Sequence, residues 1–304
     1  DTPEKLNGFG KVDSDVVPWP TLFFGMFFKN LFFWCANQMI VQKALAAKNL
    51  KESQKGAIYL SLFKVFGPLF TVLPGVVAFN YFNGSIDKSD NAYPELVTSV
   101  LPEWAFGLFG AVIFGAILSS FVGSLNSTTT LLTLDFYKPI FGKNKSDKHI
   151  ARVGHIATVV IGVIVVALAP VISLFPSGLY AVVQQFNGVY SMPVLALILV
   201  AFFSKRTSKL GAKVTLFTHI ILYAIISFVF TEINYLYTFS VLFFVDLIII
   251  LIFNKVKPSS EFDLSTHQPK VDMTPWKYRY VAGIIVLALV VVSYIIFSPL
   301  VLAK

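Results

Sequence analysis

Long apolar segments alternate with short polar connections along the whole chain of 304 residues. A helix needs about 20 apolar residues to cross a bilayer. Segments near or above that length lie at about 21–42, 57–82, 104–137, 153–174, 178–203, 210–230, 233–254 and 280–301. The longest polar connection between them runs over about 255–279. The pattern predicts an all-α integral membrane protein with about eight transmembrane helices.

Two of these segments depart from a simple straight span. The segment 57–82 contains Gly67-Pro68 and Pro74-Gly75, and membrane helices tolerate such breaks when neighbouring groups bond the freed carbonyls. The segment 104–137 would form a helix of about 50 Å at ~1.5 Å per residue, against a hydrocarbon core of about 30 Å. We therefore expect an interruption in the first segment, and tilting, bending or projection from the membrane in the second.

Composition supports a membrane protein and argues against a soluble enzyme. Hydrophobic residues make up 56% of the chain and charged residues 13%, whereas soluble domains average about 45–50% and about 25%. The net charge of +8 is therefore interpreted by membrane side, with the lipid bilayer as partner and no nucleic acid. The lone cysteine, Cys35, allows no internal disulfide, and no Cys/His cluster suits a structural metal site.

The distribution of basic residues predicts the orientation. Most of the 24 Lys and Arg residues fall in the loops after the first, third, fifth and seventh apolar segments. Those loops are expected on the cytoplasmic side, because loops rich in Lys and Arg stay inside. The polar residues 1–20 then lie outside the cell or in the periplasm, and the first segment runs inward. We expect a multi-pass protein of the cell membrane, cut from a longer chain because it opens in a soluble loop.

The first apolar segment carries a polar stripe. Asn30, Trp34, Asn37 and Gln38 recur every three to four residues, which places them on one face of a helix. Amides at membrane depth are costly unless they face protein, water or a ligand. They either bond helix to helix, as Asn and Gln do in bundles, or line a solute pathway. The number of polar groups and the basic loop that follows favour the pathway.

Lys64, Lys29 and Asp246 are charged residues inside apolar segments. Lys64 either serves a functional site or extends its ammonium to the inner membrane surface, and the sequence leaves both open. Lys29 lies nearer the outer half of its segment, where reaching the interface or pairing is favoured. Asp246, in the middle of the seventh segment, could be a proton or cation site or could pair with a neighbouring helix, and the sequence does not decide.

The third apolar segment is rich in hydroxyl groups, including Ser119 and Ser120. Small hydroxyl residues permit close helix packing, which is one explanation. Hydroxyl and carbonyl oxygens are also ligands of alkali ions in transporters. Because no carboxylate accompanies Ser119 and Ser120, a monovalent ion such as Na⁺ is favoured over Ca²⁺.

The fifth segment pairs an aromatic ring with an amide. Tyr180 and Gln184 are four residues apart and share a helix face. A ring offers a flat surface to the C–H face of a sugar, and an amide both donates to and accepts from hydroxyls. An amide bonded to a neighbouring helix is the alternative. No catalytic constellation is recognisable, so an enzyme is not predicted.

Several long motifs in order resemble the solute:sodium symporter family, above all bacterial sodium/galactose and mammalian sodium/glucose cotransporters. The resemblance covers about residues 15–215. It is carried by NLFFWCANQMIVQKALAAKN, the SLFKVFGPLF–VLPG run, AYPELV, SSFVGSLNSTTTLLTLDFYK and VVQQFNGVYSMP. It implies a LeuT-like inverted-repeat fold, with 21–204 as the second five-helix repeat, 205–304 as peripheral transmembrane helices and the first repeat outside this sequence.

The resemblance also implies a substrate site. Asn30, Lys64 and Gln184 match the residues that hydrogen-bond the sugar. Phe33 stands where the family's bacterial sugar symporter has an inner-gate Tyr, so the stacking face is kept and the phenol is lost. Trp34 matches a neighbouring pocket Trp.

The remaining implied residues concern the outer gate and the coupling ion. Tyr180 matches an outer-gate aromatic, and Ala116, Ser119 and Ser120 match the family's Na⁺ ligands. The implied function is a sodium-coupled secondary symporter that imports a galactose- or glucose-like sugar by alternating access. Alternatives are a symporter of inositol or another small solute, and a non-transporting sugar sensor or channel on the same fold.

Overall fold

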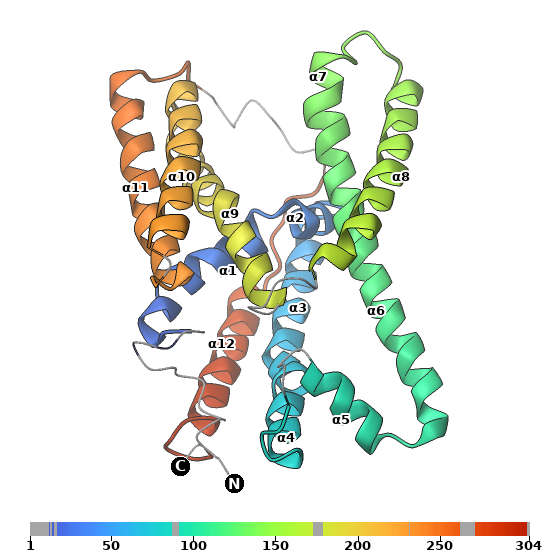
Figure 1. The fold of residues 1–304 in the computed structure, drawn as a ribbon. Coiled ribbons are helices and arrows are strands. Elements are labelled where there is room, and N and C mark those ends of the chain that lie inside the picture. Colours follow the sequence, from blue (N-terminus) through green and yellow to red (C-terminus); the bar gives the residue numbers. More distant parts are fainter. Residues whose placement is uncertain are drawn as a thin grey trace. The chain divides into compact units, whose positions relative to one another are not determined.

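The structure, a computed structural model, describes Val12, Ser14 and residues 17–86, 91–172, 179–230, 232–261 and 271–302, without the side chains of 172 and 179–182. This part of the chain consists of helices and their connections (Figure 1). The elements are η2 (Trp19–Leu22), α1 (Gly25–Cys35), α2 (Gln38–Leu45), α3 (Leu50–Thr71), α4 (Leu73–Tyr81), α5 (Ala92–Val100), α6 (Glu103–Thr130), the π-helix η4 (Leu131–Tyr137), α7 (Lys138–Ile140), α8 (Asp147–Ile172), α9 (Leu179–Phe203), α10 (Lys209–Val229), α11 (Tyr235–Val256) and α12 (Arg279–Ile296).

Seven helices of the described part are long and apolar enough to cross a membrane. They confirm the predicted all-α membrane architecture and match every predicted span except the first. Their bounds are Leu50–Tyr81, Glu103–Ile140, Asp147–Val171, Val183–Phe203, Lys209–Val229, Tyr235–Val256 and Arg279–Ile296.

The predicted first span is not one helix but two short ones, α1 and α2, and this part of the prediction is wrong. Both the Ala36 and Asn37 amides donate to the carbonyl of Phe32, which ends α1. Asn37 then turns to an extended backbone, and its Oδ1 accepts a 2.9 Å bond from the Met39 amide as the N-cap of α2. Asn is a favoured N-cap because its side chain satisfies an amide that the helix leaves free. The polar stripe therefore ends at Trp34.

The two irregular spans behave partly as expected. α3 runs through Gly67 and Pro68 without ending, and the break falls at Val72, before α4. Pro74 sits in the first turn of α4, where the missing N–H costs nothing. The long third span does deviate, because α6 passes into the π-helix η4 before α7. No pattern in the sequence predicted the π-helix.

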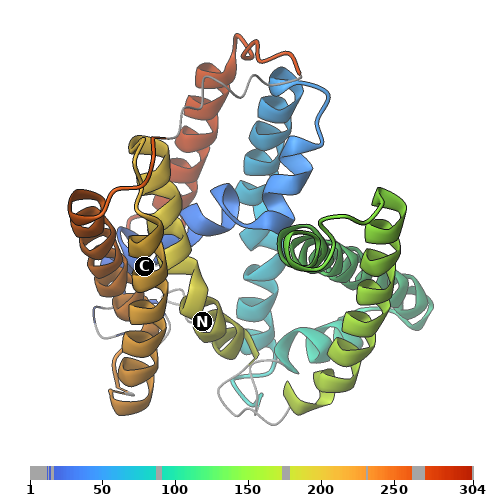
Figure 2. The ribbon, with the colours of Figure 1, turned by 90° about the horizontal axis from the view of Figure 1, so that it is seen from above.

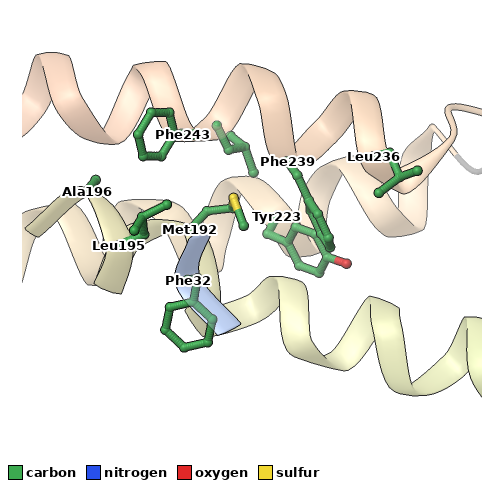
Figure 3. Close-up of a cluster of buried hydrophobic side chains, with 9 residues drawn as sticks. Phe32, Met192, Leu195, Ala196, Tyr223, Leu236, Phe239 and Phe243 are labelled. Carbon is green, nitrogen blue, oxygen red and sulfur yellow. The ribbon is translucent and has the colours of Figure 1, made fainter. Parts of the chain in front are cut away.

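The chain divides into two compact units, residues 1–80 with 183–304 and residues 81–182. The core of the first unit lies between α1, α9, α10 and α11. Figure 3 shows Phe32 of α1 beside Met192 of α9, and the rings of Tyr223 and Phe239 from α10 and α11. In the same unit α12 runs beside α3 (Figure 2).

The closest approach of α1 to α11 requires a glycine. A Cβ on Gly25 would overlap the carbonyl oxygen of Leu236 and would lie 3.0 Å from Ser240 Oγ. Gly25 is buried in this contact. The position fixes where α1 begins, and therefore where its later residues are presented.

In the second unit α6 packs along α8. Gly154 of α8 faces Thr133 of the π-helix, with a virtual Cβ only 3.5 Å from Thr133 Oγ1. At the end of the π-helix, Tyr137 Oη lies 3.1 Å from His149 Nε2, and in α7 Lys138 Nζ lies 3.5 Å from a carboxylate oxygen of Asp147. These contacts join the end of the α6 segment to the start of α8.

Candidate functional site

The candidate substrate residues of α1 gather on one side of that helix. Asn30, Phe33 and Trp34 are separated by three and four residues, so their side chains are neighbours on the helix surface. The Asn30 amide donates a 2.9 Å bond to the carbonyl of Met26 and is otherwise exposed. The Phe33 and Trp34 rings meet edge to face, with centroids 5.0 Å apart. This face therefore presents an amide oxygen beside two ring surfaces.

Lys64 brings a cation to the same face from α3. Its Nζ lies 5.2 Å from the centroid of the Trp34 ring. An ammonium over an indole is a cation–π contact, worth about 0.5–2 kcal/mol depending on how far it is desolvated. Asn30, Phe33, Trp34 and Lys64 are called the α1–α3 cluster below. The structure thus gives Lys64 an aromatic partner within the span.

Gln184 is presented by a third helix, α9, where its side chain is 7% exposed. Helix α9 contacts α1 two turns further along, where the rings of Phe32 and Tyr190 lie edge to face at 5.8 Å. The predicted outer-gate residue Tyr180 falls among the residues whose side chains are outside the described part. The structure therefore ties the helix of Gln184 to the helix of Asn30 and leaves Tyr180 as a prediction.

Ala116, Ser119 and Ser120 lie on α6, in the second unit. Their spacing of three and four residues places the three on one helix face. Each of them is exposed. Ser119 and Ser120 supply two hydroxyl oxygens, and Ala116 supplies the second lone pair of its backbone carbonyl. All three oxygens are neutral, which suits a hard monovalent cation. Three oxygens from one helix are an incomplete shell, so a second element must complete it.

A buried ion pair gives Asp246 a partner. The imidazole of His219 on α10 lies with Nδ1 2.8 Å from Asp246 Oδ2 on α11, and both side chains are fully buried. The other ring nitrogen, Nε2, lies 3.1 Å from the carbonyl oxygen of Gly188 on α9. Of the interpretations left open for Asp246, pairing with a neighbouring helix is the one observed. Sequence reasoning missed His219 as the partner, because spacing along one helix does not show which residue of α10 faces α11.

The second unit also holds a polar cavity that sequence reasoning missed. It has a volume of about 330 Å³ and lies between the end of α6, the π-helix and α8. Threonine hydroxyls form part of its wall, and Thr133 Oγ1 is buried there without a hydrogen-bond partner in the described part of the chain. Its polar lining comprises Asn126, Thr129, Thr130, Thr133, Lys138, Asp147, His155 and Thr158. The hydroxyl residues at the end of the third apolar segment are the signal in the sequence that could have indicated this cavity.

Comparison with known proteins gives consistent relatives. Over 282 residues the chain is 38% identical to the uncharacterized symporter YidK of Escherichia coli, covering 92% of this chain and 49% of YidK. It is 33% identical over 204 residues to a sodium/glucose cotransporter of Vibrio parahaemolyticus, covering 62% of this chain and 37% of that protein. It is 31% identical over 213 residues to the human sodium/myo-inositol cotransporter 2, covering 64% of this chain and 31% of that protein.

The chain thus spans about half the length of YidK and about a third of the two cotransporters. Residues 2–218 match the model of the sodium:solute symporter family, which is a family of membrane transporters and not of enzymes. The match contains every substrate and Na⁺ candidate named above. Together with the seven spans, it identifies this chain as a member of the sodium:solute symporter family.

Proposed function

We propose that the protein carrying this chain is a sodium-coupled symporter that imports a sugar or a sugar-like polyol. The observation that carries the proposal is the α1–α3 cluster, in which an amide, two rings and an ammonium from two helices lie side by side. Membership of the sodium:solute symporter family supplies the class of activity. Relatives named for glucose and for myo-inositol support a polyhydroxylated substrate.

The cluster offers the groups that bind such a substrate. A ring face covers the C–H side of a sugar, while amide and ammonium groups bond its hydroxyls. The Phe33 ring is 39% exposed, so part of its face is free to cover a ligand. Lys64 donates and cannot accept, whereas Asn30 and Gln184 do both, and this mixture suits hydroxyls, which also do both. Gln184 would complete the site from α9.

Sodium is the proposed coupling ion, with Ala116, Ser119 and Ser120 as part of its shell. The neutral oxygen set fits Na⁺ for the reasons given above. Coupling requires that Na⁺ and sugar each favour the same conformation, and the effect of one on the affinity for the other is then reciprocal.

The proposed organisation places 21–204 in the second five-helix repeat and 205–304 in peripheral transmembrane helices. The interrupted α1–α2 segment supports it, because transporters of this plan build midplane sites from discontinuous helices. We place residues 1–20 outside the cell or in the periplasm and the Lys-rich loops in the cytoplasm, on the distribution of basic residues.

A second candidate function is a sodium symporter of myo-inositol or of a small carboxylate. The human relative named for myo-inositol favours the first, and the ammonium of Lys64 would pair with the second. YidK, the relative that matches most of this chain, is named a symporter without a substrate. A sugar sensor or channel on the same fold would bind the solute without concentrating it.

The test is uptake into proteoliposomes that hold the protein at its natural length. Labelled galactose, glucose, myo-inositol and gluconate are supplied with an inward Na⁺ gradient, and an equal K⁺ gradient serves as control. We expect saturable accumulation of a sugar above equilibrium that requires Na⁺. Accumulation of only gluconate would replace the sugar with a carboxylate, and solute-gated current without accumulation would support the sensor.

A further inference from the structure

His219 has both ring nitrogens engaged in the interior of a three-helix contact. Its Nδ1 faces Asp246 Oδ2 of α11 and its Nε2 faces the carbonyl oxygen of Gly188 of α9. A carbonyl oxygen only accepts, so Nε2 must carry a proton. A second proton must then lie between Nδ1 and the carboxyl group, whichever of the two holds it. The pair is neutral as a whole, and Asp246 fixes the ring so that Nε2 points at α9.

Tyr223, one helical turn beyond His219 on α10, makes a second contact of the same kind. Its ring stacks on the imidazole at a centroid distance of 6.0 Å and an interplanar angle of 7°. Its hydroxyl donates a 2.7 Å bond to the carbonyl of Gln185. Two neighbouring side chains of α10 therefore hold two carbonyls of α9, three residues apart. These four residues with Asp246 are called the α9 clamp below.

The clamp lies beside a weak point of α9. Pro193 lies inside the helix and has no N–H, so the carbonyl four residues earlier lacks its helical partner. Gly188 adds a position without a side chain, and a Cβ there would overlap the ring of Phe239 and lie 2.7 Å from the Tyr223 hydroxyl. A helix softened in this way can bend or rotate unless neighbouring groups hold it.

The clamp bears on the proposed substrate site through Gln184, which immediately precedes Gln185. Rotation of α9 about its axis would swing this side chain away from the ligand. His219 and Asp246 lie beyond the family match, which ends at residue 218.

We propose that His219, oriented by Asp246, is a positioning residue for substrate binding that sets the rotation of α9 and so the presentation of Gln184. The proposal rests on the proposed function through Gln184. Its structural half, the clamp on α9, stands independently of any substrate and can be tested separately.

The decisive comparison uses two replacements of the pair. Asp246→Asn keeps the geometry, because the new amide donates to a neutral Nδ1 while Nε2–H still bonds Gly188. The double change His219→Phe with Asp246→Leu replaces the pair with apolar groups, which often leaves stability unchanged or raised. It removes the bond to α9 and leaves no unpaired charge. Asn254→Leu is the control, since it perturbs α11 about 12 Å from Asp246 at ~1.5 Å per residue.

Two measurements are made on each variant. The first is uptake of the transported solute, which gives the apparent KM and the maximal rate. The second is hydrogen–deuterium exchange of the α9 amides. In the double variant we expect KM to rise about tenfold, the effect of roughly 1.4 kcal/mol, with a nearly unchanged maximal rate. Amides around 184–190 should exchange faster. Asp246→Asn and Asn254→Leu should both stay within about twofold of the wild-type KM and keep the wild-type exchange.

Wild-type KM and wild-type α9 exchange in the folded double variant would overturn the proposal, and so would an Asp246→Asn variant as impaired as the double variant. If the double variant does not fold, Tyr223→Phe removes the hydroxyl that bonds Gln185 and also contacts Ser227 on its own helix. Faster α9 exchange in that variant supports the clamp and unchanged exchange refutes it. If wild-type protein takes up no tested solute, the proposed function fails, while the exchange measurements still decide the clamp.

Discussion

Replacing Gly25 with alanine is the most direct test of how α1 is held. A Cβ at this position would overlap the carbonyl oxygen of Leu236 and would lie 2.9 Å from its carbonyl carbon. That carbonyl also accepts a 2.9 Å bond from Ser240 Oγ, so it cannot turn aside cheaply. Because the obstacle is backbone, α1 itself has to move, on the order of 1 Å to restore ordinary van der Waals separation.

The expected cost follows from two opposing effects. Overpacking of a well-filled contact costs about 1–3 kcal/mol, and replacing glycine with alanine in a helix returns about 0.5–1 kcal/mol. The balance lowers the free energy of unfolding by about 1–2 kcal/mol, or an apparent Tm lower by about 2–6 °C for a protein of this size. The KM should rise as well, since the Asn30 amide bonds the carbonyl of Met26, the residue after the substituted glycine.

The assay is thermal unfolding of detergent-solubilised protein followed by intrinsic fluorescence, with Gly56→Ala as the matched control. Gly56 lies within α3, and a Cβ there meets no described atom within 4 Å. The control makes the same chemical change without the contact, so its apparent Tm should stay level or rise. Equal apparent Tm values for the two variants would refute the close approach of α1 to α11.

Three further substitutions test the site. Gln184→Ala should raise the KM for sugar about tenfold, because one hydrogen bond of roughly 1.4 kcal/mol is lost. The Na⁺ concentration for half-maximal uptake should change much less, and an unaltered sugar KM would remove Gln184 from the site. Ser120→Ala should raise the half-maximal Na⁺ concentration several-fold, and an unchanged Na⁺ dependence would argue against α6 as an ion ligand. Phe33→Tyr adds a hydroxyl to a ring that is 39% exposed and should lower the sugar KM; a higher KM would contradict its place beside the ligand.

The lengths of the apolar segments predicted most of the helices, because a backbone that crosses lipid has few alternatives to a helix. Seven of the eight predicted spans correspond to helices whose ends lie within about seven residues of the predicted bounds. The first predicted span is broken into two helices, because the apolar content of a segment does not show where a side chain caps a new helix. Asn37 looked like part of a polar face, but its side chain instead bonds the Met39 amide and starts a new helix.

The candidate site was predictable where helical spacing alone decides proximity and unpredictable where distant helices meet. Asn30 and Trp34 share a face by their spacing, and the structure keeps them together. The approach of Lys64 to Trp34 depends on how α3 packs against α1, which spacing along one helix does not encode. The pairing of Asp246 with His219 was open for the same reason, because each residue taken alone reads as an isolated polar group in an apolar span.

Residues beyond the family match, which ends at residue 218, bond to the helices that carry the proposed substrate residues. α9, with Gln184, is bonded by His219 and Tyr223 of α10. α3, with Lys64, is bonded at its first turns by the segment before α12, where the Leu50 amide donates to the Asp272 carbonyl and the Trp276 amide to Gln54 Oε1 at 2.7 Å.

We expect these attachments to let α10 and the segment before α12 influence which solute the proposed substrate site binds. A change in α10 or in the segment before α12 would shift Gln184 or Lys64 without altering either residue, and a shift of one hydrogen bond is worth about tenfold in affinity. Relatives with the same site residues but different peripheral contacts can then prefer different polyols. It follows that comparing site residues alone will under-predict differences in substrate within this family, and that exchanging the segment 219–302 between relatives is the change that should reveal them.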